Sequence, residues 1–437
     1  MVGVGWALKA AAIAASLLIV AAPAGAQLAA APPRASAALQ SPDAALEQDA
    51  GAMADRLGMT ASQAARQLRL QQASVPVTDA IAVRFADRLA GISIEHVPGF
   101  RIVVRLTGDD PVETEHLELA GERADIVYVV GNPASHAELV QAISAYQAAI
   151  RASLTVAPGL GVDQRTGELV ATVSARDVAR EGAQPLRARL ATLTRVPVRL
   201  RVVDQSEFDM AGDGEGVVGG MRMMGGVPGD PRQFLCTAGF VVTDGARLAL
   251  ATAAHCPDTL RVHDAAGREE VLPFEGQWGG GHQDVQINLS AVPLAPHFFA
   301  DTARTTSRAV TGAQPRASTR AGDVICHRGE RTGYSCSVVE LTDFAPAGNL
   351  CGGACLPTWI TVAGPTCKGG DSGGPVFLGT TAHGIVKGGS YRANGSCAFY
   401  FYMSTDYLPN NWRILTANYS LSQHERTAGA GIVDGVQ

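Results

Sequence analysis

The chain has 437 residues, of which 46% are hydrophobic and 17% are charged, and its formal net charge is -6. This length exceeds one typical domain, and the slightly acidic balance gives no basic surface of the kind that nucleic acid binds, so we expect no nucleic-acid partner. All eight cysteines lie at or beyond residue 236. An even set of cysteines confined to one region predicts disulfides formed outside the cytosol.

The first 26 residues have the order of a secretory signal peptide. Lys9 precedes an apolar run over residues 10–22, which is too short for a comfortable membrane span. Ala24-Gly25-Ala26 then supplies a cleavage site of small residues. We therefore expect cleavage after Ala26 and a secreted protein without a membrane partner.

The region from residue 27 to about 205 is predicted to be a cysteine-free α+β region. Residues 27 to about 50 are rich in Ala, Pro and Gln, and we expect them to be flexible. Capping boxes that start at Thr60 and Ser135 predict two helices, the second continuing to Ile150. Further patterns predict strands over residues 100–106, 124–130, 167–174 and 196–203, and a helix near 179–193.

Residues 212–231 are rich in Gly and Met, carry few structural signals and separate the two parts of the chain. Beyond them, short strands alternate with turns, as in an all-β domain. The predicted strands cover residues 237–242 and 247–254, which flank a hairpin turn, and residues 321–326, 333–339 and 384–389. A last helix is expected around residues 411–417, followed by a polar tail from about Ser420.

Two motifs in the second half carry chemistry. Residues 370–375 read Gly-Asp-Ser-Gly-Gly-Pro, in which glycines leave the backbone unobstructed around the Ser372 hydroxyl, as attack on a carbonyl requires. Upstream, residues 252–256 read Thr-Ala-Ala-His-Cys, after an apolar, strand-like run. A serine hydroxyl needs an adjacent base, and histidine titrates near the working pH. We therefore predict that Ser372 is a nucleophile and that His255 is its general base and acid.

Both motifs resemble those of the chymotrypsin-like serine proteases, in which the triad order is His, Asp, Ser. The resemblance implies an aspartate between residues 256 and 371, and the available ones are Asp258, Asp264, Asp284, Asp301, Asp323 and Asp343. We choose Asp284, because alternation after it predicts a half-buried strand and because its distance from His255 resembles the spacing of the family. Asp301 and Asp264 are weaker alternatives, since each lies among polar or turn-forming residues.

The resemblance also implies the rest of a catalytic site. The backbone N–H groups of Gly370 and Ser372 would form the oxyanion hole, and Asp371 would hold that turn in shape. Thr366, Lys387, Gly388 and Gly389 would bind substrate, with the strand over residues 384–389 as one pocket wall. Gly364, Pro365 and Thr366 include no acid, so a trypsin-like preference for Arg or Lys before the cut is disfavoured.

Lysine is rare in this chain, occurring only as Lys9, Lys368 and Lys387. The latter two flank the nucleophile, and Lys387 stands where the family usually has a serine that forms a hydrogen bond near the catalytic aspartate. We hypothesise that both lysines favour acidic or polar substrate side chains through their local field. The alternative is that they are solvated surface charges.

The resemblance further implies how the cysteines pair. Cys236 would bond Cys256 beside the histidine, Cys326 would bond Cys336, and Cys367 would bond Cys397 across the pocket. Cys351 and Cys355 then remain as a pair. Their close spacing leaves open a thiol oxidoreductase or a metal site, but a small stapled loop fits better without a nearby histidine.

The whole chain resembles the bacterial streptogrisin and α-lytic branch of this family. The resemblance implies an α+β pro-region over residues 27–216, acting as intramolecular chaperone and inhibitor, and then an all-β protease domain of two six-stranded antiparallel barrels over residues 217–437. Cleavage after Gly216 would yield a monomeric serine endopeptidase that acts on polypeptides and needs no cofactor or metal. Two alternatives remain open: a first half retained as a binding module, and a catalytically inactive binding protein on the same fold.

Overall fold

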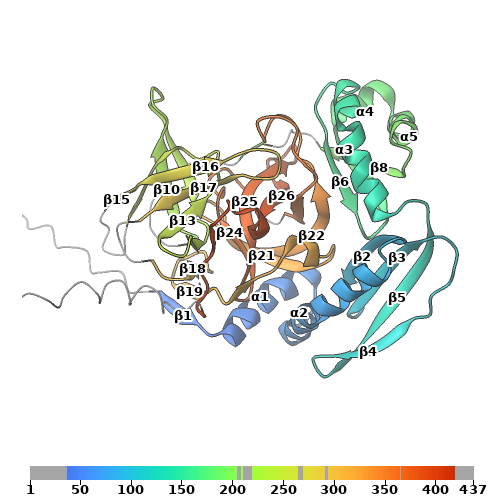
Figure 1. The fold of residues 1–437 in the computed structure, drawn as a ribbon, viewed down its shortest axis with the longest axis horizontal. Helices are drawn as coiled ribbons and strands as arrows, with labels where there is room; N and C mark the ends of the chain where they lie inside the picture. The colour runs from blue at the N-terminus through green and yellow to red at the C-terminus, as the bar shows by residue number, and fades with distance from the viewer. Residues whose placement is uncertain are drawn as a thin grey trace, which may run out of the picture. The chain divides into compact units, whose positions relative to one another are not determined.

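The computed structural model describes residues 37–203, 208–209, 219–263, 269–290, 294–364 and 366–418 (Figure 1). The expected signal peptide, the expected cut after Gly216, Asp264 and the polar tail lie outside the described residues. None of the helices in the described ranges is long and apolar enough to cross a membrane.

The first half of the chain combines helices with two sheets. Its helices are α1 (Pro42–Leu57), α2 (Ala61–Arg84), α3 (His136–Ala152), α4 (Ala175–Glu181) and α5 (Ala183–Thr194). One sheet has the order β2-β3-β5-β4, with β2 (Leu89–Glu95), β3 (Arg101–Thr107), β4 (Glu115–Leu119) and β5 (Glu122–Asn132). The other contains β6 (Gly159–Asp163), β7 (Glu168–Ser174) and β8 (Val198–Val203) in chain order.

The capping boxes predicted from the sequence are present at both helices. Thr60 Oγ1 accepts a hydrogen bond from the Gln63 backbone N–H. In return, the Gln63 side-chain oxygen accepts one from the Thr60 backbone N–H. Ser135 and Glu138 make the same exchange before α3. Both pairs satisfy N–H groups that an α-helix leaves without an internal partner.

The prediction that residues up to about 50 are flexible is wrong for the described part of that stretch. Strand β1 (Ala38–Gln40) pairs in parallel with β19 (Thr306–Ala309), and α1 starts after Ser41, which caps it, with a proline in its first turn. Proline favours this position because the first helical N–H groups have no partner within the helix. The alanines that suggested disorder are good helix formers, and Leu46 and Ala50 bury one face of the helix.

The second half is dominated by strands. A four-stranded sheet has the order β11-β10-β14-β15, with β10 (Arg222–Gly226), β11 (Gln233–Thr237), β14 (Thr259–His263) and β15 (Glu269–Leu272). A five-stranded sheet has the order β16-β17-β13-β12-β27, with β12 (Val241–Thr243), β13 (Leu248–Thr252), β16 (Phe274–Trp278), β17 (Val285–Leu289) and β27 (Arg413–Ile414). The predicted hairpin is the antiparallel pair β12 and β13. Short pieces complete this half: β18 (His297–Phe299), β19 (Thr306–Ala309), β20 (Gly312–Ala313), η1 (Arg316–Ser318) and η2 (Thr405–Tyr407).

Six further strands of the second half close into a barrel. They are β21 (Val324–Gly329), β22 (Gly333–Phe344), β23 (Trp359–Ala363), β24 (Pro375–Leu378), β25 (Thr381–Tyr391) and β26 (Cys397–Ser404). Their order is β25-β24-β21-β22-β23-β26, and β26 pairs with β25 to complete the ring. Closure leaves this barrel without a free edge.

The helix expected around residues 411–417 is absent. This stretch contains β27, in which Ile414 pairs with Val242 of β12, and Asn411 has a positive φ of 78°. A residue with that φ does not continue a right-handed helix. The tertiary pairing with β12 therefore overrides the local helical preference.

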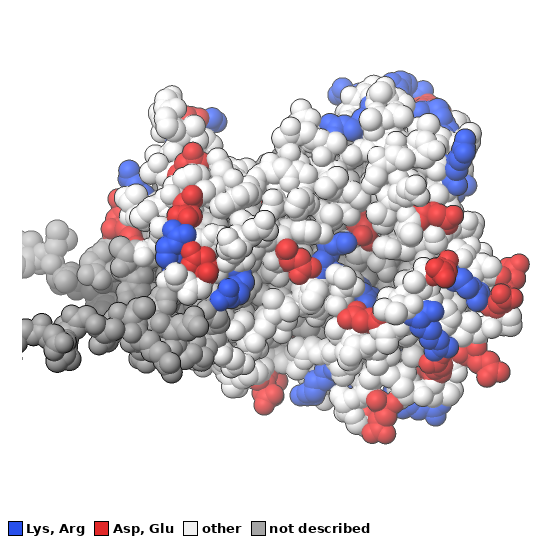
Figure 2. Space-filling model, in the orientation of Figure 1, with Lys and Arg blue, Asp and Glu red and all other residues white. Residues whose placement is uncertain are grey.

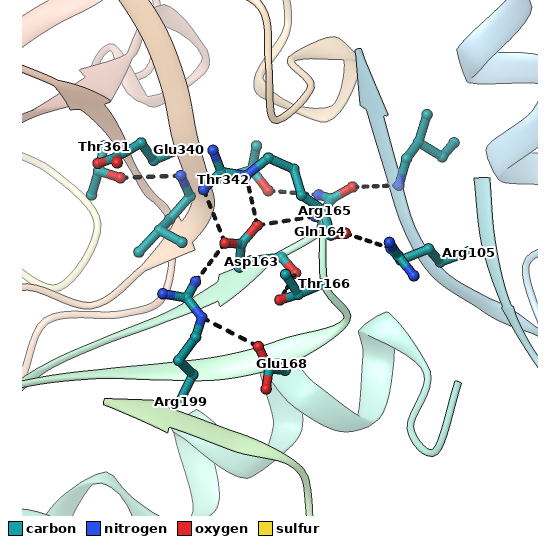
Figure 3. Close-up of polar contacts among 12 residues, drawn as sticks. Arg105, Asp163, Gln164, Arg165, Thr166, Glu168, Arg199, Glu340, Thr342 and Thr361 are labelled. Atoms are coloured by element: carbon teal, nitrogen blue, oxygen red, sulfur yellow. Dashed lines mark hydrogen bonds and ion pairs between the residues drawn. The ribbon is translucent and has the colours of Figure 1, made fainter. Parts of the chain in front are cut away.

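The first half packs directly on the second. Helix α1 contacts β22, and apolar residues of α1 and α2, among them Leu46, Met53 and Leu68, share one buried cluster with Phe298 and Phe377 (Figure 1). Gln164, after β6, donates a hydrogen bond to Thr342 of β22 at 2.6 Å (Figure 3). Arg201 of β8 pairs with Glu340 at 2.9 Å. The contact between the halves is therefore both apolar and polar.

A buried ion pair joins α1 to the second half. The Arg308 guanidinium binds both carboxylate oxygens of Asp49, at 3.0 and 2.9 Å, and both side chains are fully buried. The Tyr334 hydroxyl and the Gly379 N–H also donate to Asp49, at 2.7 and 2.6 Å. A buried charge needs such partners, because its transfer from water is costly. On the surface in Figure 2, by contrast, acidic and basic side chains are interspersed, with no large area of one sign.

Candidate active site

His255, Asp284 and Ser372 come together in the structure, as the sequence predicts. His255 follows β13, Asp284 directly precedes β17, and Ser372 precedes β24. The imidazole Nδ1 lies 2.9 Å from Asp284 Oδ2, and Nε2 lies 2.8 Å from Ser372 Oγ. The His255 backbone N–H also donates to Asp284 Oδ1 at 3.2 Å. A chain of hydrogen bonds therefore runs from a carboxylate through an imidazole to a hydroxyl.

The Asp284 carboxylate is buried and surrounded by opposite charge. Burial alone raises its pKa, but the Lys387 ammonium and His255 outweigh this and hold the pKa at about 2. Lys387 Nζ lies 3.4 Å from Asp284 Oδ2, and both side chains are 2% exposed. Asp284 is therefore an anion at neutral pH, as a group that orients and stabilises an imidazolium must be.

The sequence predicts Lys387 in a substrate pocket, at a position near the catalytic aspartate, but it does not predict that the ammonium contacts Asp284. The ammonium faces Asp284, whereas Lys368, the other lysine near the nucleophile, is exposed. The Lys387 backbone still contributes to the site, because its carbonyl accepts a hydrogen bond from Ser372 Oγ at 3.2 Å.

The turn that carries Ser372 is fixed from several sides. Gly370 has a φ of 109°, and a Cβ there would lie 2.6 Å from a Leu235 methyl carbon, so only glycine fits. The buried Asp371 accepts hydrogen bonds from the N–H groups of Arg331, Thr332 and Lys368, and from the Thr332 hydroxyl at 2.7 Å. This geometry agrees with the supporting role expected for Asp371.

Two threonines that sequence reasoning missed also hold this turn. Thr237 Oγ1 donates to the Gly370 carbonyl at 2.7 Å, and its backbone N–H donates to the Ser372 carbonyl at 2.8 Å. Thr252 Oγ1 donates to the Thr237 carbonyl at 2.8 Å. The contacts of Thr237 with the turn connect positions more than a hundred residues apart, so no local pattern could reveal them.

The expected substrate-binding residues lie on neighbouring segments. Gly388 and Gly389 belong to β25 and pair with Phe401 and Tyr400 of β26. On their other side they pair, antiparallel, with β9 (Phe208–Asp209) from the first half of the chain. Thr366 precedes the disulfide-bonded Cys367, and its hydroxyl donates to Ser335 Oγ at 2.9 Å.

The described alternatives to Asp284 are placed elsewhere. Asp258 is exposed, and Asp301 accepts hydrogen bonds from the N–H groups of Thr305 and Thr306 in its own turn. Asp323 accepts one from the Arg320 N–H, and Asp343 pairs with His136 and Arg316.

All eight cysteines form disulfides, in the pairs that the resemblance implies. The bonds are Cys236–Cys256, Cys326–Cys336, Cys351–Cys355 and Cys367–Cys397. Two of them lie beside the site, one next to His255 and one next to Thr366. Because Cys351 and Cys355 are bonded to each other, they offer no free thiolate to a metal in this state.

The chain is similar to bacterial serine proteases of the chymotrypsin-like family, in the streptogrisin branch. It is 26% identical over 173 residues to Streptogrisin-C of Streptomyces griseus, a match that covers 38% of this chain and 35% of that protein. The match thus spans about a third of the relative's length. No family model matches the chain. Among solved structures, Thermobifida fusca protease A has a TM-score of 0.37 and 22% identity, covering 46% of this chain and 99% of its own. A Nocardiopsis protease has a TM-score of 0.36 and 21% identity, covering 46% and 100%.

Proposed function

We propose that the chain is the precursor of a secreted serine endopeptidase that hydrolyses polypeptides through an acyl-enzyme intermediate. The observation that carries this proposal is the continuous hydrogen-bond chain from Asp284 through His255 to Ser372. The similarity to Streptogrisin-C supports it independently.

In the proposed reaction, Ser372 Oγ attacks the carbonyl carbon of the scissile peptide bond while His255 Nε2 takes its proton. The negative charge that develops on the carbonyl oxygen is stabilised by the N–H groups of Gly370 and Ser372. His255 then donates its proton to the leaving amine, and a water molecule hydrolyses the acyl-enzyme by the same proton transfers in reverse order. Asp284 keeps the imidazole oriented and stabilises its protonated form.

The proposed precursor is inhibited by its own first half. Two observations support this: β9 pairs with Gly388 and Gly389, where a substrate strand is expected to bind, and Ser372 is fully buried. A bound strand of the same chain occupies main-chain groups that a substrate needs. We propose that cutting after Gly216 removes the pro-region and that the released enzyme is a monomer with no cofactor. Its preference before the cut is not trypsin-like, because no acid stands at Gly364 or Thr366.

A direct test combines labelling with hydrolysis. The secreted protein is treated with an organophosphonate probe, its tryptic peptides are weighed, and hydrolysis of casein is measured in parallel. We expect the label on Ser372, and in Ser372→Ala we expect kcat to fall by about 10⁴-fold or more. A folded, processed protein whose Ser372 stays unlabelled and that cleaves no peptide would instead be a binding protein on this fold.

A further inference from the structure

A buried cation stands directly behind the carboxylate of the site. Lys387 Nζ and His255 Nδ1 both contact Asp284 Oδ2, at 3.4 and 2.9 Å. The Lys387 side chain is 2% exposed, so water does not screen its charge as it would at the surface. One carboxylate oxygen is therefore shared between an imidazole on one side and an ammonium on the other.

The local backbone explains why Lys387 points inward. The register between β25 and β26 shifts between Val386 and Gly388, which leaves Lys387 as the extra residue of a β-bulge. A bulge bends a strand and redirects a side chain, and such bulges are frequent next to active sites. Val386 and Gly388, on either side of it, still pair with Tyr402 and Phe401 of β26.

The Trp359 ring packs against the Lys387 ammonium. Lys387 Nζ lies 5.4 Å from the centre of the fully buried Trp359 ring, within the range of a cation–π contact. The Trp359 indole N–H donates to the Gly281 carbonyl at 3.2 Å, in the loop that leads to Asp284. Trp359 thus connects Lys387 with the segment that carries the carboxylate.

We propose that Lys387 is a positioning residue of this site, whose ammonium holds the Asp284 carboxylate in place behind His255. This inference rests on the proposed protease function for its kinetic consequence, but its structural part does not.

The charge has a consequence for pH. Among the described residues, two titratable groups contact Asp284: His255, from the turn after β13, and Lys387, from β25. The contact from β26 is not titratable, because it is the Met403 sulfur, to which the Asp284 N–H donates at 3.2 Å. His282, two residues before Asp284, contacts the Tyr407 ring instead. Burial raises the pKa of Asp284, and Lys387 is the strongest influence that lowers it. Without the ammonium, the carboxylate would take up a proton at a higher pH.

The decisive variant is Lys387→Met, which keeps the apolar stem and removes the charge. We expect kcat to fall about tenfold to a hundredfold with KM within about twofold, since an outer partner orients a reacting group without touching substrate. We also expect the acid limb of the kcat/KM profile to move up by about one to two pH units, since the loss of a positive charge a few ångströms away favours the protonated form of the hydrogen-bonded His255–Asp284 pair. Lys387→Arg should keep the acid limb near that of the unmodified protein. An unchanged acid limb and unchanged kcat in Lys387→Met would overturn the inference.

Two controls separate this role from general stability. Arg261→Met removes an exposed cation that pairs with Glu269 at 3.6 Å on β14 and β15, and should leave the acid limb unchanged. If Lys387→Met does not fold, Lys387→Gln removes the charge but retains a hydrogen-bond donor of similar length. The acid limb of this variant should move up as well, and an unmoved limb would contradict the inference equally.

A second readout does not depend on activity. In full-length Ser372→Ala, the proton NMR signal of His255 Nδ1–H reports the hydrogen bond to Asp284. We expect this signal to be lost as the pH falls. When Lys387→Met is added to this background, the loss should occur at a pH about one unit higher than in Ser372→Ala alone. If the protein with Ser372 intact hydrolyses no peptide but the signal in the Ser372→Ala background changes as expected, the proposed function fails and the role of Lys387 stands. If peptides are hydrolysed but signal and acid limb are unaffected, the role of Lys387 fails alone.

Discussion

The two halves of the molecule are held by different means. The second half contains four disulfides and a closed six-stranded barrel, whereas the first half has no cysteine and is attached to the second through side chains, shared apolar packing and short strand pairings such as β1 with β19. Covalent bonds are indifferent to salt and acid, but ion pairs and hydrogen-bonded histidines are not. The difference implies that the first half can be displaced under conditions that leave the second half folded.

The strongest test of this comparison is to break the buried pair between Asp49 and Arg308. Asp49→Ala leaves the Arg308 guanidinium buried without its carboxylate, which we expect to destabilise the attachment of α1 by about 3 to 5 kcal/mol. Hydrogen exchange should then show loss of protection over Pro42–Leu57 with little change in the barrel strands. Glu47→Ala, an exposed change in the same helix, is the matched control. Equal protection of α1 in both variants would show that the apolar contacts suffice.

The opposite test weakens the second half alone. Replacing Cys367 and Cys397 together by serine opens a loop with a sequence separation of 30, and chain entropy predicts a loss of about 3 to 4 kcal/mol. We expect thermal unfolding to begin in the barrel while the exchange protection of β6 and β7 is retained. The comparison between the halves would be wrong if both lost protection together.

The smallest expected effect is the response of the contact to acid. His96 of the first half lies against the second half, with its Nε2 3.1 Å from the Gly322 carbonyl oxygen. Burial lowers the pKa of His96 to about 4. When the first half is detached, His96 is exposed to water and its pKa returns to about 6.5. Between about pH 4 and pH 6.5 the detached state therefore binds more protons than the attached state, and the attachment weakens as the pH falls below about 6.5. At pH 5 the loss should be about 2 kcal/mol. Limited proteolysis between pH 7 and pH 5 measures it, and His96→Gln should remove the pH dependence.

The segments that carry the candidate site residues could be predicted from sequence because their signals are local. The glycines around Ser372 and the apolar run before His255 are local, and the alternation after Asp284 marks a strand that the structure contains as β17. The direction of Lys387 could not be predicted, because it depends on a bulge between two strands. Composition was misleading for residues 38–50, which form β1 and the first part of α1 and not a flexible tail. The helix predicted around residues 411–417 is wrong because pairing with β12, which is distant in sequence, makes part of this stretch a strand.

The apolar cluster shared by α1, α2 and the second half has a consequence for solubility. Leu46, Met53 and Leu68 cover part of the surface to which Phe298 and Phe377 belong. If processing removes the helices, that surface enters water, and an apolar patch of this kind promotes self-association. An isolated second half should therefore aggregate more readily with rising concentration and salt than the full chain. By covering this surface, the helices would keep the chain soluble until processing, in addition to any effect on the site.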